Sequence, residues 1–167
     1  MVTKEPFETV VAQHGATVLR VARAVAGPVD ADDVWSETFL AAMKSYPDLS
    51  VGANVEAWLV TIAHRKAIDV LRAAARRAAP LADLPEQPAR ERADGRDLDL
   101  DDALGSLTAK QRQAVAYHYF AGLPYQQVAD ITGSTAAAVR RAASDGVAAL
   151  RRVYLKHPSR SEQQERR

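Results

Sequence analysis

Residues 123–141 read LPYQQVADITGSTAAAVRR, a pattern that predicts two helices joined by a tight turn. Val128 and Ile131 give the first helix its apolar residues, and Gly133 supplies the turn, because a residue without Cβ adopts positive φ at little cost. Ser134 stands where an N-cap residue is expected to accept a backbone hydrogen bond at the start of the second helix. The stretch therefore predicts a helix-turn-helix.

The second of these helices carries an apolar stripe at spacings of three and four residues, formed by Val139, Ala143, Val147, Leu150 and Tyr154. Arg140 and Arg141 lie off this stripe, near the start of the helix. A helix held in this way can enter the major groove of DNA with its N-terminal side chains at base edges. The same pattern also fits an ordinary helical hairpin with solvated arginines, so the local sequence leaves both interpretations open.

The composition excludes several classes of protein. The chain of 167 residues has no cysteine, so it forms no disulfide and no thiolate metal site. Its four histidines show no ligand spacing, and we predict neither a metal nor a cofactor. No nucleophile is paired with a base and no phosphate-binding glycine loop occurs, which argues against an enzyme. Without a run of about 18 apolar residues or a signal-like N-terminus, we expect a cytoplasmic protein with no membrane insertion.

The net charge of +1 divides unevenly along the chain. Residues 1–79 carry 9 basic and 9 acidic side chains, residues 80–106 carry 3 and 8, and residues 107–167 carry 10 and 4. The chain thus consists of a neutral first block, an acidic connecting segment and a basic second block. This asymmetry favours a nucleic-acid partner for the basic end.

Apolar residues at helical spacing predict the elements of the first block. Asp30 and Asn54 are the expected N-caps of the second and third helices. The predicted helices cover residues 6–26, 30–46 and 54–77.

In the second block, we predict a short helix over residues 101–106 and a longer one that ends near Phe120. Thr108 and Gln111 form the expected capping box of the longer helix. Its expected inward-facing residues are Val115, Tyr119 and Phe120.

These elements predict an all-α fold of two small helical domains. Three prolines and a glycine replace the helical periodicity between the two blocks, which is typical of a linker. We predict domains over residues 1–79 and 101–156, a flexible acidic linker over residues 80–100, and a polar tail over residues 157–167.

Two motifs, in this order, resemble one family. DADDVWSETF at residues 30–39 and AWLVTIAHRKAIDVLR at residues 57–72 look like region 2 of the small extracytoplasmic-function (ECF) sigma factors of the sigma-70 family. Residues 104–151 are similar to their region 4. The resemblance implies a region 2 bundle of three to four helices and a region 4 helix-turn-helix. It also implies an alternative sigma factor that binds core RNA polymerase and directs promoter-specific transcription initiation.

The resemblance assigns expected roles to residues of the first block. The positions that match the contacts with the β′ clamp helices of the polymerase are Asp33, Ser36, Glu37 and Met43. The expected contacts with the −10 element, including a loop that takes up a flipped base, are Leu49, Ser50, Asn54, His64, Arg65, Lys66 and Arg72.

In the second block, the positions that match the −35 contacts are Tyr125, Gln126, Gln127, Thr135, Ala136, Arg140 and Arg141. The resemblance also implies the β flap of the polymerase and an anti-sigma factor as partners, and a path near the transcript for the acidic residues 94–102. The family usually has basic residues where this chain has Ala142 and Asp145. An alternative is therefore a sigma-like decoy, which binds an anti-sigma factor or polymerase without reading DNA sequence.

Overall fold

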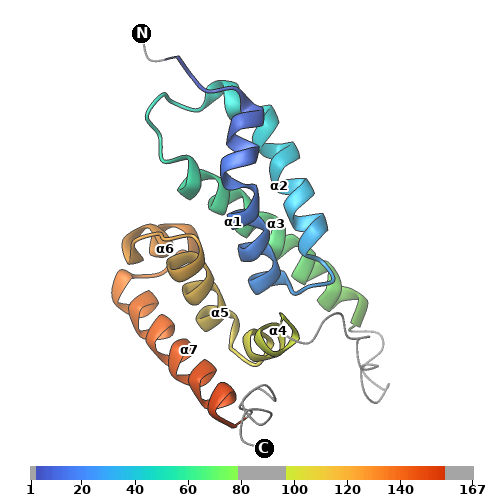
Figure 1. Ribbon diagram of the computed structural model, residues 1–167, viewed down its shortest axis with the longest axis vertical. Helices are drawn as coiled ribbons and strands as arrows, with labels where there is room; N and C mark the ends of the chain where they lie inside the picture. Colours follow the sequence, from blue (N-terminus) through green and yellow to red (C-terminus); the bar gives the residue numbers. More distant parts are fainter. Residues whose placement is uncertain (1–2, 79–96, 157–167) are drawn as a thin grey trace, which may run out of the picture.

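The computed structural model describes residues 3–78 and 97–156, and every regular element in these two ranges is a helix (Figure 1). The first range, the N-terminal body, holds α1 (Phe7–Ala26), α2 (Ala31–Ser45), the 3-10 turn η1 (Tyr46–Asp48) and α3 (Val55–Ala78). The second, the C-terminal body, holds α4 (Asp97–Gly105), α5 (Ala109–Val115), the π-helical turn η3 (Ala116–Phe120), α6 (Tyr125–Thr132) and α7 (Ala136–Lys156). The predicted all-α class with two small helical domains is confirmed.

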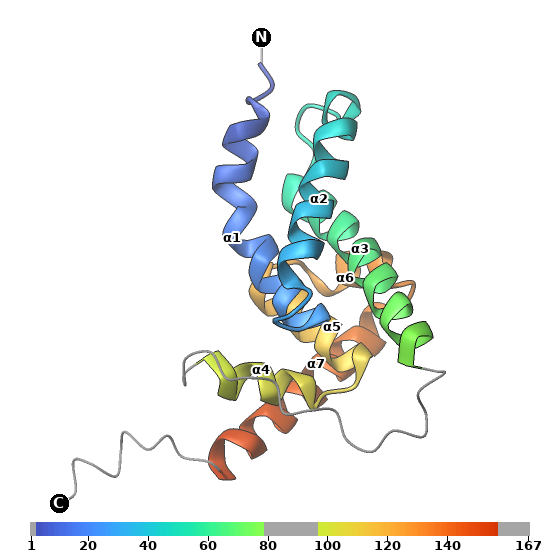
Figure 2. The ribbon, with the colours of Figure 1, turned by 90° about the vertical axis from the view of Figure 1, so that its right-hand side faces the viewer.

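In the N-terminal body, α1, α2 and α3 pack against one another (Figure 2), and part of their buried surface forms an apolar cluster of its own. Phe39 belongs to this cluster, and its ring centroid lies 4.7 Å from that of Trp35 and 6.4 Å from that of Phe7. The apolar periodicity placed all three helices correctly to within about one residue, because each buries one stripe against the other two. The fully or nearly buried core residues are Val10, Val18, Phe39, Ala42, Leu59 and Ala63.

The two predicted caps in this body have different outcomes. Asn54 is confirmed, since its Oδ1 accepts a hydrogen bond from the Ala57 N–H at 3.0 Å. Asp30 stands at the N-cap position of α2, but its side chain makes no capping hydrogen bond. Its backbone is already helical (φ −97°, ψ −5°), whereas a capping side chain needs the extended conformation.

In the C-terminal body, the capping box of α5 is confirmed by the reciprocal bonds between Thr108 and Gln111, both 3.2 Å long. Gly133 has φ +69° and ends α6, as predicted. The predicted cap at Ser134 is wrong, because the Ser134 N–H still closes α6 through a 2.9 Å bond to the Ala129 carbonyl. Thr135 caps α7 instead, and its Oγ1 accepts from the Ala138 N–H at 3.2 Å.

The predicted inward face near Phe120 is partly wrong. Tyr119 is 54% exposed, while Tyr117 is fully buried. The cause is η3, where the Ala121 N–H bonds to the Ala116 carbonyl five residues back. A π-helical turn adds a residue and rotates the following side chains off an α-helical stripe, which periodicity does not anticipate.

The short helix predicted over residues 101–106 begins four residues earlier in the structure, as α4 (Asp97–Gly105). α4 starts at Asp97, and Leu100 packs against the core cluster that includes the buried Leu104 and Leu107. Acidic residues suit the first turn of a helix, and part of the acidic run belongs to α4. Residues 80–96 of the predicted linker and the predicted tail, residues 157–167, lie outside the described residues.

The two bodies also pack against each other, which the sequence did not predict (Figures 1 and 2). α1 contacts α4, α5 and η3, and one core cluster includes Val21 of α1 as well as Leu104 and Tyr117 of the C-terminal body. The Arg23 guanidinium donates to both carboxylate oxygens of Asp101, over 2.7–3.1 Å.

Candidate nucleic-acid interface

The outer face of α2 presents acidic groups first and apolar groups later. Asp33, Ser36 and Glu37 are exposed, and Met43 is 51% exposed. Leu40, which was not among the predicted contact residues, continues the same side of the helix and is 50% exposed. Its spacing from the other residues, three or four positions, was the available signal. The four predicted polymerase-contact positions thus lie on one continuous surface.

The loop after η1 borders a cavity of about 180 Å³ near the N-terminus. Ser50 on its rim is exposed and Leu49 is half-buried. The Lys4 ammonium donates to the Tyr46 carbonyl and, at 2.7 Å, to the Leu49 carbonyl. Lys4 was not predicted, because nothing in its local sequence links it to a loop more than 40 residues away. It holds the loop at a fixed distance from the start of α1.

Three of the predicted −10 residues follow one side of α3. At about 100° per residue, Asn54, Arg65 and Arg72 fall within roughly 20° of one another around the helix. Arg65 and Arg72 are exposed. Lys66 lies nearer α2, with its Nζ 3.9 Å from Glu37 Oε2. The guanidinium groups are therefore accessible to a phosphate backbone along one line.

His64 is placed differently from the other predicted −10 residues. Its Nδ1 lies 2.7 Å from the hydroxyl of the buried Tyr117, in the contact between the bodies. Burial, and then the nearby Arg65 charge, lower the pKa of His64, while burial raises the pKa of Tyr117. The imidazole is therefore favoured in its neutral form, with the tyrosine hydroxyl donating to it.

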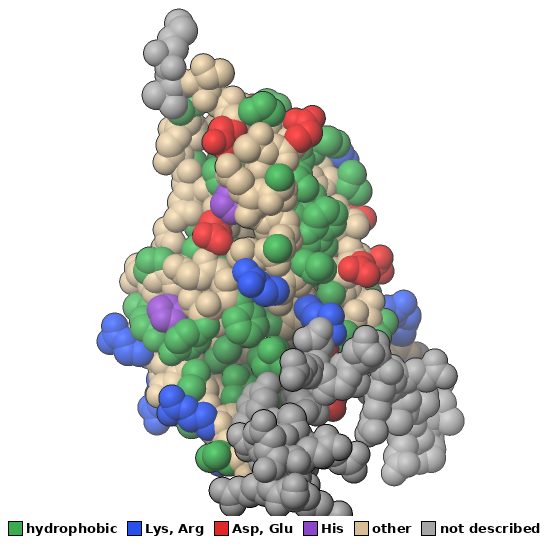
Figure 3. Space-filling model, in the orientation of Figure 1, with side chains coloured by type: hydrophobic (Ala, Val, Ile, Leu, Met, Phe, Trp, Pro, Cys, Tyr) green, Lys and Arg blue, Asp and Glu red, His purple; other side chains and the backbone are tan. Residues whose placement is uncertain are grey.

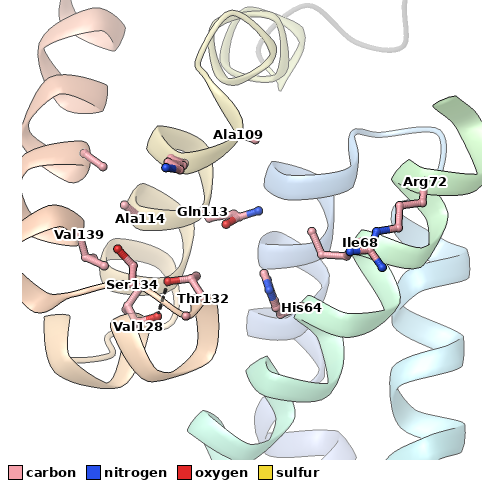
Figure 4. Close-up of a pocket in the computed structure, with 13 residues that line it drawn as sticks. His64, Ile68, Arg72, Ala109, Gln113, Ala114, Val128, Thr132, Ser134 and Val139 are labelled. Carbon is pink, nitrogen blue, oxygen red and sulfur yellow. Dashed lines mark hydrogen bonds between the residues drawn. The ribbon is translucent and has the colours of Figure 1, made fainter.

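A cleft of about 420 Å³ separates α3 from the helix-turn-helix (Figure 4). Figure 4 shows His64, Ile68 and Arg72 on the α3 side, facing Gln113 and Val139 from α5 and α7. Part of the predicted −10 surface thus lines the same cleft as residues beside the predicted −35 surface. None of the predicted −35 residues is among those that line the cleft.

The start of α7 exposes Thr135, Arg140 and Arg141, with Ala136 half-buried beside them. Gln126 of α6 is exposed, and its amide donates to Asp130 Oδ1 at 3.0 Å. Within the described residues, the Oε1 atom of Gln127 is buried without a hydrogen-bond partner. The predicted −35 residues therefore gather around the helix-turn-helix.

Tyr125 belongs to a small aromatic cluster that the sequence did not predict. Its ring stacks on His118 at a centroid distance of 3.9 Å and an interplanar angle of 16°. The Arg140 Cζ lies 5.3 Å from the same ring. Partial burial, together with a hydrogen bond with the Tyr119 hydroxyl, raises the pKa of Tyr125. The π-helical turn η3 brings His118 here, and no sequence signal predicted that turn.

Charge is segregated on the face drawn in Figure 3. Acidic side chains lie over the upper part of the view, on the N-terminal body, whereas most Lys and Arg side chains lie lower. Among the described residues, no group of His, Asp and Glu side chains is placed to hold a metal ion. The described helices also include none with the length and apolar character needed to cross a membrane.

Comparison with known families gives a match to each body. A family model described as Sigma-70 region 2 matches residues 10–77, and one described as Sigma-70, region 4 matches residues 97–150. Together the two matches cover well over half of the chain, and in the expected order. The chain therefore belongs to the sigma-70 family.

The individual relatives that the chain matches are sigma factors of the ECF group. The chain is 37% identical over 116 residues to the ECF RNA polymerase sigma factor SigK of Mycolicibacterium vanbaalenii, which covers 63% of this chain and 58% of that protein. It is 32% identical over 104 residues to SigK of Mycobacterium sp. strain JLS, which covers 57% and 54%. The chain thus spans little more than half the length of the curated relatives it matches.

Two solved structures share the arrangement of helices. The sigma factor RpoE of Bartonella quintana, in complex with the anti-sigma factor NepR, matches with a TM-score of 0.75 at 21% identity over 92% of this chain and 98% of that chain. CnrH, in complex with the cytosolic domain of CnrY, matches with a TM-score of 0.63 at 25% identity over 92% and 89%. These matches cover both bodies of the present chain.

Proposed function

We propose that this chain is an alternative sigma factor, a cytoplasmic binding subunit that performs no catalysis itself. It binds core RNA polymerase and directs initiation through the −10 and −35 elements of a restricted set of promoters. The observation that carries this proposal is the succession of regions 2 and 4 on one chain. Region 2 exposes acidic side chains on α2 for polymerase, and both regions expose arginines for DNA.

The outer face of α2 is the proposed polymerase contact. Asp33 and Glu37 suit a basic partner helix through charge-assisted hydrogen bonds. Leu40 and Met43 extend the same surface with exposed apolar area, which a partner can bury. The β′ clamp helices are the proposed partner here, and the β flap is the proposed partner of the C-terminal body.

The α3 side and the helix-turn-helix are the proposed DNA contacts. Arg65 and Arg72 follow the opening −10 strand, and the loop at Leu49 and Ser50 receives a flipped base beside its open cavity. Extruding a base costs a few kcal/mol, which contacts in the loop offset. Arg140 and the start of α7 enter the −35 major groove.

Promoter binding then requires the N-terminal and C-terminal bodies to separate. His64 belongs to the proposed −10 surface, yet it contacts the buried Tyr117 hydroxyl. A DNA strand reaches its ring only after the cleft between α3 and the C-terminal body opens. The arrangement in which the two bodies pack against each other, here called the closed arrangement, is thus the form of the chain before it binds polymerase.

An anti-sigma factor is the proposed regulatory partner. The similar structure of RpoE was determined with the anti-sigma factor NepR, and that of CnrH with the cytosolic domain of CnrY. By analogy, an inhibitor of this chain holds the two bodies so that neither DNA surface is free.

Copurification with core RNA polymerase tests the proposal. Because like charges across an interface cost several kcal/mol, Asp33→Lys combined with Glu37→Lys is expected to abolish the complex. Glu8→Lys, an exposed charge change on α1, serves as the control and is expected to leave binding intact. If the unaltered chain forms no stable complex with core polymerase, or the α2 variant binds normally, the proposed contact is wrong.

A further inference from the structure

Three side chains from different elements form a stack on the C-terminal body. His118 comes from η3, Tyr125 is the first residue of α6, and Arg140 lies on α7. The imidazole covers one face of the Tyr125 ring at 3.9 Å, almost parallel to it. The Arg140 guanidinium lies over the same ring, with its Cζ 5.3 Å from the ring centroid and thus within cation–π range.

His118 is itself fixed by the backbone. Its Nδ1 lies 2.8 Å from the Leu123 carbonyl oxygen, which only accepts hydrogen bonds, so this nitrogen carries a proton. Leu123 is 2% exposed, and its N–H donates to the Tyr117 carbonyl at 3.1 Å. The stack therefore begins at a buried turn and ends at an exposed arginine.

We propose that His118 is a positioning residue for DNA recognition: it holds the Tyr125 ring, which in turn holds Arg140 ready for the −35 element. This inference rests on the proposed function. An arginine that is ordered before binding loses less side-chain freedom when DNA arrives. Ordering one flexible side chain corresponds to about a two- to tenfold change in affinity, and this is the size of effect expected here.

Two substitutions separate the properties of the histidine. His118→Asn keeps an N–H that can reach the Leu123 carbonyl but removes the aromatic face. His118→Phe keeps the face and removes the donor. If stacking positions Arg140, the phenylalanine variant retains most of the discrimination at the −35 element and the asparagine variant does not. Thermal unfolding of each variant, measured in parallel, reports any general loss of structure.

The experiment measures binding of the chain, assembled with core polymerase, to a selected promoter and to variants with single changes in the −35 element. His118→Asn is expected to reduce discrimination two- to tenfold at the base pair that Arg140 reads. In an Arg140→Ala background, the same substitution is expected to have no further effect. An equal loss in both backgrounds, or unchanged discrimination, overturns the proposal.

A second measurement needs no DNA and so stands apart from the proposed function. Nitrogen-15 relaxation of the Arg140 Nε–H in the free chain reports the order of the side chain. We expect less order in His118→Asn and nearly unchanged order in His118→Phe. Unchanged order in His118→Asn overturns the stack as a positioning device. If instead the unaltered chain shows this order but no promoter preference, the proposed function fails and the stack stands.

Discussion

The ion pair between Arg23 and Asp101 offers a quantitative test of the closed arrangement. The Asp101 side chain is 7% exposed and that of Arg23 is 40% exposed, and two N–H groups contact both carboxylate oxygens. Coupling in exposed pairs is about 0.2–1 kcal/mol, and breaking a fully buried pair costs about 3–5 kcal/mol. Because Asp101 is buried and Arg23 is partly exposed, we expect a coupling between these limits, about 1–2 kcal/mol.

The assay is a double-mutant cycle in urea with Arg23→Gln, Asp101→Asn and the combined variant. Arg23 makes further interactions, so its single substitution reports more than this pair. The coupling term removes that contribution, since it counts only what the two residues share. Exchanging the two charges, Arg23→Asp with Asp101→Arg, is expected to recover part of the lost stability.

The distance between the bodies supplies the second readout. The chain has no cysteine, so labels at Ala16→Cys and Ser144→Cys, both exposed positions, report this distance without interference. Asp101→Asn is expected to broaden the distribution towards longer distances. A coupling below about 0.3 kcal/mol together with an unchanged distribution would refute a role for this ion pair in holding the two bodies together.

Three further predictions follow from the same structure. Gly146→Ala places a Cβ 2.8 Å from Val115 Cγ2, and this overlap is expected to lower the free energy of unfolding by about 1–3 kcal/mol. A urea titration measures the loss. Gly105→Ala serves as the control and is expected to be nearly neutral, because the space around Gly105 is open. Because the pKa of His64 is lowered on folding, the unfolded chain binds more protons near pH 6, so stability is expected to fall as pH drops below about 6.5. Unfolding titrations from pH 7.5 to 5.5 measure this, and a slope that persists in His64→Gln contradicts the assignment. Arg141→Ala is expected to reduce the salt slope of promoter binding by about 1 if Arg141 contacts a phosphate, and an unchanged slope in filter binding across salt concentrations rules that contact out.

Local sequence patterns predicted the helices because each buries a periodic stripe and has recognisable ends. Thr108 and Gln111 form their capping box from residues three apart, and Gly133 takes positive φ where the turn requires it. Such features depend on neighbours along the chain. The cap of α7 was displaced by one residue, since the backbone of Ser134 still belongs to the closure of α6.

Most of the features that the sequence did not predict depend on residues far apart in the chain, and the π-helical turn is the local exception. The contact of His64 with Tyr117 joins positions 53 residues apart, and that of Arg23 with Asp101 joins positions 78 apart. The π-helical turn that buries Tyr117 also exposes Tyr119, against the α-helical period. The resemblance to a family supplied the candidate site residues, but it gave no indication of whether the two bodies contact each other.

The most direct test of the central claim is to map the 5′ ends of transcripts made by core RNA polymerase with and without this chain on genomic DNA. We expect new start sites that share a −10 and a −35 sequence at a fixed spacing, and we expect their loss with Arg140→Ala or with the α2 charge reversal. A chain that binds core polymerase but leaves the distribution of start sites unchanged would contradict the account and favour the decoy.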